Sequence, residues 1–118
     1  MNVKDLLISI LKTQWKDYPI IQQGSMSDDE KYPDHFFTFF NNESYDESFY
    51  DNIETKTIWD FDLNFYSVDP ALVNTVLLTA KSLLKQNGFI VSGAGYDVIS
   101  DEETHTGRGI NVTYVEFV

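Results

Sequence analysis

The most constraining feature of the sequence is a strict alternation of side-chain character between Glu54 and Ser67. One set of alternate positions is mostly aromatic or aliphatic: Thr55, Thr57, Trp59, Phe61, Leu63 and Phe65. The other set is mostly polar: Lys56, Ile58, Asp60, Asp62, Asn64 and Tyr66. Because successive side chains of a strand point to opposite faces of the sheet, the pattern predicts a long strand. One of its faces covers a core, and the other is wet or partner-bound.

Hydrophobic spacing predicts two amphipathic helices. The first runs from about Asn2 to Lys16 and ends before Pro19, which cannot continue a helix. The second begins at an Asp69-Pro70 cap and ends at Asn87-Gly88, where glycine accommodates left-handed backbone.

Shorter apolar runs predict the remaining strands, and polar runs predict loops. The predicted strands are 20–22, 35–40, 89–91 (resuming at 96–99 after a bulge or turn at 92–95) and 110–118. The predicted loops are 24–34, 41–52 and 101–109. The order α-β-β-β-α-β-β predicts one two-layer α+β domain over residues 1–118. In it, two helices pack on one face of a mostly antiparallel sheet.

The composition excludes several classes of protein. The chain has no cysteine, so a disulfide framework, a thiolate metal site and a cysteine nucleophile are all excluded. No window approaches the length of apolar sequence needed to span a membrane. The acid at Asp5 and the lack of a small-residue cleavage site argue against a signal peptide.

The charge is strongly and unevenly negative. The formal net charge is −11, and residues 24–54 hold nine acids against Lys31 alone, a local net of −8. Proteins that grip nucleic acid need clustered basic residues, whereas this chain has one arginine, Arg108, and seven dispersed lysines. We therefore expect no direct, sequence-specific nucleic-acid binding and a strongly negative loop face.

Two groups of residues have side chains of the kind found in catalytic or metal sites. Asp60 and Asp62 lie two apart on one strand face, and acids stand close to both His35 and His105. Neither group has the ligand spacing of a calcium loop or a zinc site. The 92–95 segment also lacks the helix and the lysine of a phosphate-binding loop. We expect no enzyme activity, no cofactor and no metal; a metal-dependent hydrolase using Asp60, Asp62 and His105 is the weaker alternative.

Three segments carry a resemblance to a known family. They are WDFDLNFYSVDPALVN at 59–74, LLKQNGFIVSGAGYDV at 83–98 and SDEETHTGRGI at 100–110. With the HFFTFF strand at 35–40, the match covers roughly residues 35–117. The chain resembles the tail terminator group of siphophages and prophages of Gram-positive bacteria, also called tail completion, head–tail joining or minor tail proteins.

The resemblance implies a structural role in the virion neck. Members of the group have a small α/β fold and assemble as a hexameric ring that caps the tail tube. The implied partners are other copies of the chain, the major tail tube protein and a head-completion or connector protein. The implied location is the virion tail, and the host cytoplasm during assembly. Another neck protein, such as a head-closure or minor tail protein, is an alternative.

A ring requires contacts between different surfaces of neighbouring copies, and exposed sheet edges can supply them. We expect such an edge at the last strand, which ends at Val118, and docking elements in the loops 41–53 and 100–109. The candidate interface residues are Asp46, Asp51, Tyr66, His105, Arg108, Tyr114 and Phe117.

Arg108 is expected to clamp a carboxylate, either on a neighbouring copy or within the chain at Asp101, Glu102 or Glu103. The competing functional class is a small acidic binding or inhibitor module of the DNA-mimic type.

Overall fold

The computed structural model describes residues 2–23, 32–49, 53–100 and 102–117, and for 43–49 and 53–55 only the backbone. The elements are α1 (Val3–Gln14), β1 (Ile20–Gln22), β2 (His35–Phe49), β3 (Ile53–Ser67), α2 (Pro70–Gln86), β4 (Ile90–Val98) and β5 (Thr106–Phe117). This is the predicted α-β-β-β-α-β-β order.

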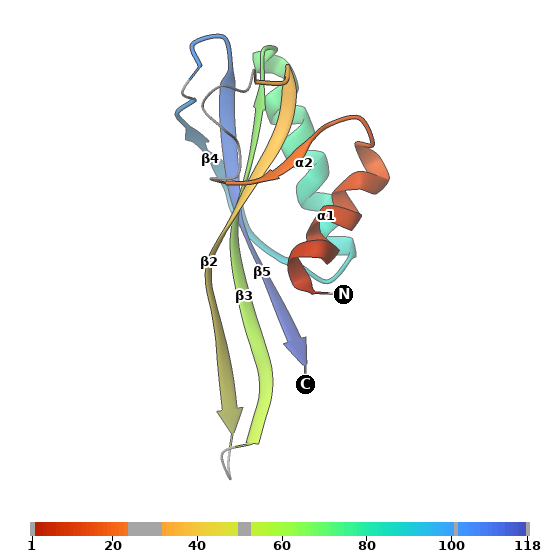
Figure 1. Cartoon of the computed structure of the whole chain (residues 1–118), viewed down its shortest axis with the longest axis vertical. Helices are drawn as coiled ribbons and strands as arrows, with labels where there is room; N and C mark the ends of the chain where they lie inside the picture. Colours follow the sequence, from red (N-terminus) through yellow and green to blue (C-terminus); the bar gives the residue numbers. More distant parts are fainter. Residues whose placement is uncertain (1, 24–31, 50–52, 101, 118) are drawn as a thin grey trace.

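The five strands form one sheet in the order β1-β2-β3-β5-β4. β1 pairs with β2 in parallel, whereas the other three pairings are antiparallel. Both helices lie on the same side of the sheet (Figure 1). The fold is therefore the predicted two-layer α+β arrangement, and neither of the described helices lies on the opposite face of the sheet.

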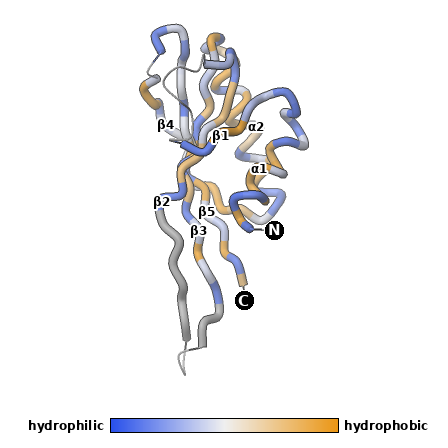
Figure 2. Tube along the Cα trace, in the orientation of Figure 1, coloured by the Kyte–Doolittle hydropathy of each residue, from blue (hydrophilic) through white to orange (hydrophobic). Residues whose placement is uncertain are grey.

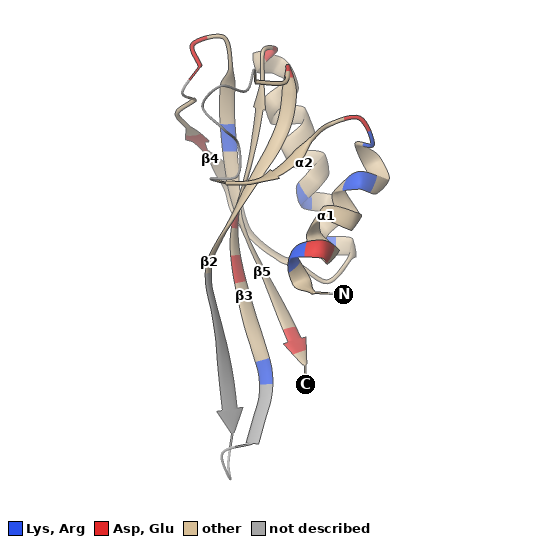
Figure 3. Cartoon of the chain, in the orientation of Figure 1, with Lys and Arg blue, Asp and Glu red and all other residues tan. Residues whose placement is uncertain are grey.

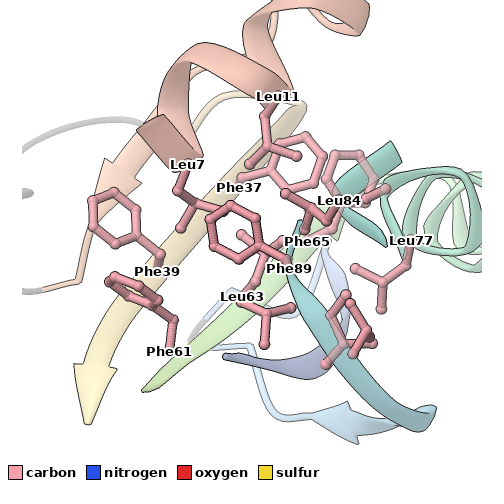
Figure 4. Close-up of a cluster of buried hydrophobic side chains, with 14 of the residues drawn as sticks. Leu7, Leu11, Phe37, Phe39, Phe61, Leu63, Phe65, Leu77, Leu84 and Phe89 are labelled. Carbon is pink, nitrogen blue, oxygen red and sulfur yellow. The ribbon is translucent and has the colours of Figure 1, made fainter. Parts of the chain in front are cut away.

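The core lies between the helices and the sheet. Phe61, Leu63 and Phe65 alternate along β3 and are fully buried, as the sequence pattern predicts. Figure 4 shows them packed against side chains from β2 and from both helices. In Figure 2 the apolar residues are concentrated where the strands pass beneath the helices. Burial of these large side chains fixes which face of the sheet the helices cover.

Both helices are capped, and the caps of α2 are the ones that the sequence predicts. The Asn2 side chain accepts a hydrogen bond from the Asp5 N–H at 2.8 Å, so α1 begins one residue later than expected. The Asp69 side chain accepts from the Ala71 N–H at 3.1 Å, with Pro70 in the first turn of α2. Gly88 has a φ of 91° and continues the chain into Phe89, whose N–H donates to the Leu84 carbonyl. This 6→1 bond is typical of a Schellman motif.

The predicted loop at 41–52 is wrong for most of its length. β2 continues to Phe49 and pairs with β3 as far as Phe49↔Ile53. The two strands form a hairpin that extends well beyond the helices (Figure 1), and we call its outer part, residues 43–49 and 53–58, the arm. Polar residues in 41–52 led to a loop prediction, but strand pairing satisfies their backbone groups and overrides that local preference.

The end of the chain also differs from its prediction. β5 begins at Thr106, so residues 106–109 belong to a strand and not to a loop. β5 lies between β3 and β4, which makes β4, and not the final strand, the edge of the sheet. The glycine-rich segment of β4 does interrupt its pairing, because the register shifts between Ser92 and Tyr96. The bulge predicted at 92–95 is thus confirmed.

Candidate functional site

A hydrogen-bonded polar network lies on the sheet face that carries no helix. Asn111 of β5 stands opposite Asp62 of β3 and donates its side-chain amide to Asp60 Oδ1 at 2.9 Å and to Asp62 Oδ1 at 3.3 Å. Thr113 also donates to Asp60 Oδ1, at 3.3 Å. Tyr96 reaches over from β4 and donates its hydroxyl to Asp62 Oδ1 at 3.1 Å. The two carboxylates are therefore held by neutral donors.

The network lies in a negative electrostatic environment. The pKa of Tyr96 is raised from 10.0 to about 12. Burial of the phenol is the main cause, followed by the charge of Asp62, its hydrogen bond to Asp62 and the charge of Asp60. Ionisation of the phenol would place a third negative charge beside two carboxylates, so Tyr96 remains a hydrogen-bond donor at neutral pH.

Two glycines in β5 make room for the tyrosine rings of this face. A Cβ at Gly109 would collide with Asn64 Oδ1 and stand 3.0 Å from the Tyr96 ring. A Cβ at Gly107 would come within 2.7 Å of the Tyr66 ring. The prediction that residues 106–109 end a loop is therefore wrong. They belong to β5, and the two glycines among them allow the tyrosine rings to pack against the strand.

A pocket of about 310 Å³ opens beside the network. Its lining comes from β2, β3, β4 and the residue that follows β1: Gln23, Phe40, Asn42, Asp62, Asn64, Tyr96 and Val98. Asn64 is only 7% exposed, and its Oδ1 accepts no hydrogen bond within the described part of the chain. That oxygen is buried against Gly109 and does not open into the pocket. The pocket is a candidate binding site because it holds the Asp62 carboxylate beside the partly exposed rings of Phe40 and Tyr96.

Arg108 is paired within the chain. Its Nη1 donates to Asp97 Oδ1 at 2.7 Å, and its Nη2 donates to the Ala94 carbonyl at 3.3 Å. The carboxylate partner is thus in β4, and not at Glu102 or Glu103 as expected; Asp101 lies outside the described residues. The bond to Ala94 also ties the bulge of β4 to β5.

His105 lies at the end of the open face near α2. Its Nε2 is 2.8 Å from the Pro33 carbonyl, to which it donates, and its ring contacts those of Tyr32 and Phe36 edge-on. Phe36 in turn stacks on Tyr66, with ring centroids 5.2 Å apart. His105 and Tyr66 thus belong to one aromatic cluster that covers this end of the sheet.

The other predicted interface residues lie apart from that cluster. Tyr114 is half-buried against Phe89 on the helix side of the sheet, with ring centroids 4.8 Å apart. Phe117, near the arm, is 78% exposed. Asp46 lies in the arm, where only the backbone is described, and Asp51 lies outside the described residues.

The residues of the hydrolase alternative do not come together. Asp62 pairs with Asn111, which is six residues along the chain from His105, so His105 lies roughly 20 Å away at about 3.3 Å per residue. Within the ranges that the structure describes, no group of three His, Asp or Glu residues converges as a metal site. Neither described helix is long and apolar enough to cross a membrane.

The sheet has two open edges. β4 pairs only with β5 in the described structure, and Ile90 at its start is 56% exposed. At the other side, β1 pairs with β2 only from Phe37 to Phe39, and no described strand flanks the backbone of 43–49 on its outer side. Unpaired strand edges present backbone donors and acceptors to another chain.

Sequence reasoning identified Asp60 and Asp62 but missed Asn64, Tyr96 and Asn111 as their neighbours. The alternation placed Asn64 on the polar face, yet nothing local indicated its burial. A search of protein-family models finds no match to the chain, and a comparison with curated proteins finds none either.

Proposed function

We propose that this chain is a structural protein of the head–tail joining region of a siphophage or prophage. In this role it is a tail-terminator-like subunit whose copies form a hexameric ring on the tail tube. The ring joins the major tail tube protein to a head-completion or connector protein in the virion neck. The resemblance of residues 35–117 to that group is the origin of the proposal.

The observation that carries the proposal is the pair of open edges at opposite sides of one sheet. If the outer edge of β4 in one copy pairs with the arm of the next, every copy uses two different surfaces. Such heterologous contacts generate a ring when the rotation between copies closes. A two-stranded hairpin is only marginally stable alone, so a neighbouring copy would also support the arm.

Charge sets the conditions under which a ring would form. Each copy carries a net −11, and Figure 3 shows basic residues mainly on the two helices, with acids along β3 and at the end of β5. Copies brought together through the arm therefore repel one another. Because the screening length falls from about 10 Å at 0.1 M salt to about 3 Å at 1 M, salt should favour assembly.

The test measures assembly by sedimentation velocity and negative-stain microscopy. Protein concentration and salt are varied, with and without a siphophage major tail tube protein. We expect rings at high salt or on tubes. Ile90→Lys places a charge on the β4 edge and should abolish rings while the monomer stays folded. The matched control is Leu78→Lys on α2, because Leu78 is 50% exposed and the charge change is the same.

Two outcomes contradict the proposal. The first is a chain that stays monomeric at every salt concentration and never associates with tubes, which would favour the acidic binding module instead. The second is assembly that Ile90→Lys and Leu78→Lys affect equally, which would show that the β4 edge is not an interface.

A further inference from the structure

The pocket beside Asp62 is rich in hydrogen-bond acceptors that lack donors. Asp62 Oδ1 accepts from Tyr96 and Asn111, whereas its Oδ2 accepts no hydrogen bond from any described residue. Asn42 donates its amide to Asp60 Oδ2 at 3.3 Å, which leaves its carbonyl oxygen as a further acceptor. A ligand that suits this pocket brings several donors.

The lining of the pocket includes two aromatic rings, and its charged residue, Asp62, is negative. Phe40 stands opposite Asp62 in the ladder and is 47% exposed, and Tyr96 on the far side is 42% exposed. None of the residues that line the pocket is basic. Aromatic faces beside a carboxylate attract a cation both by charge and through the ring quadrupole. Burial raises the pKa of the Tyr96 phenol, and the charges of Asp62 and Asp60 raise it further.

We propose that this pocket receives an arginine side chain of a partner protein, with the guanidinium paired to Asp62 and flanked by Phe40 and Tyr96. Guanidinium is planar, offers five N–H donors and stacks on aromatic rings, which matches an acceptor-rich pocket better than the compact ammonium of lysine. A volume of about 310 Å³ is small for a ligand pocket and suits one side chain.

The partner is a different protein from this chain. Arg108 is the only arginine in the sequence, and its guanidinium is already paired with Asp97. The inference does not depend on ring formation, because the pocket lies on the open face and not along the outer edge of β4 or the arm.

The probe is N-acetyl-arginine amide, titrated into the isotope-labelled protein while the side-chain amide signals of Asn42 and Asn64 are followed by NMR. N-acetyl-citrulline amide is the matched neutral probe, because it keeps the shape and loses the charge. We expect the arginine probe to shift both signals with a Kd on the order of millimolar, typical of a single half-exposed contact. The citrulline probe should shift them little at the same concentration.

Variants separate specific pairing from general attraction. Asp62→Asn should weaken binding about tenfold, as expected for loss of a charge-assisted hydrogen bond. Glu102→Gln changes the net charge equally on a distant loop and should bind like the wild type. Phe40→Leu keeps an apolar surface without the ring and should weaken binding about threefold. It also tests the pocket independently if Asp62→Asn perturbs folding.

Three results would overturn the proposal. One is equal binding of the citrulline and arginine probes. Another is wild-type affinity in both Asp62→Asn and Phe40→Leu. The third is a shift of the same two amide signals by magnesium or calcium chloride at micromolar concentration, which would assign the pocket to a metal ion.

Discussion

Replacing Asn64 with leucine should stabilise this protein. Leucine has the branched shape of asparagine but carries two methyl groups in place of the amide oxygen and nitrogen. In the native structure Asn64 is 7% exposed, and its Oδ1 lies against Gly109 without a hydrogen-bond donor. Water hydrates that carbonyl in the unfolded chain. Folding removes the water and supplies no hydrogen-bond donor in its place, so burial of the carbonyl is destabilising.

The size of the gain follows from the cost of that unpaired atom. A buried acceptor without a donor costs about 1–3 kcal/mol. The methyl group that replaces Oδ1 is slightly larger than the oxygen and lies against the Gly109 backbone. The resulting steric crowding reduces the gain in stability by up to about 1 kcal/mol. The net expectation is a gain of about 1–2 kcal/mol in the free energy of unfolding. For a domain of this size that raises Tm by about 4–8 °C.

Asn111 provides the matched comparison on the same face. Its amide donates to Asp60, Asp62 and the Phe61 carbonyl, so Asn111→Leu removes satisfied bonds. It also leaves two carboxylates facing an apolar group. We expect a loss of about 1–2 kcal/mol. Urea denaturation with equal m-values, together with calorimetric Tm, measures both variants. A loss of stability in Asn64→Leu comparable to that in Asn111→Leu would refute the reasoning, because it would mean that the Asn64 amide is satisfied in solution.

Asp69→Ala removes the α2 cap and should cost about 0.5–2 kcal/mol in urea denaturation; unchanged stability would show that the cap is dispensable. Gly109→Ala inserts a methyl group under Asn64 and the Tyr96 ring and should cost about 1–3 kcal/mol, and a neutral result would mean that the two side chains move aside freely. The phenol of Tyr96 should titrate near pH 12 when tyrosinate absorbance is followed, and earlier in Asp62→Asn. Unfolded tyrosine loses its proton near pH 10, so between pH 10 and 12 the unfolded state binds fewer protons and the free energy of unfolding falls with rising pH. Tyr96→Phe should reduce this decrease in the free energy of unfolding between pH 10 and 12. An unchanged pH dependence would contradict the assignment of the raised pKa to Tyr96.

Helices and strands could be predicted from the sequence where the signal depends on residues close together in the chain. Helix caps depend on a side chain and backbone groups two or three residues away, so Asp69 and Gly88 could be identified directly. The alternation in β3 fixed which residues face the core, because side-chain direction in a strand has a period of two. These two signals, with the helical spacing of apolar residues, were sufficient for the α+β class and the element order.

The tertiary structure alone decided which strands are neighbours and which polar residues meet. The sequence indicates neither that β4 is the edge nor that β2 continues to Phe49, because backbone pairing depends on a partner distant in the chain. The meeting of Asp62, Asn111 and Tyr96 follows from the register of three strands, because Tyr96 and Asn111 lie 34 and 49 residues from Asp62 in the chain. A one-residue slip in any of those pairings would move the side chains to opposite faces of the sheet. The polar network and its pocket therefore exist only once burial of the aromatic face has set that register.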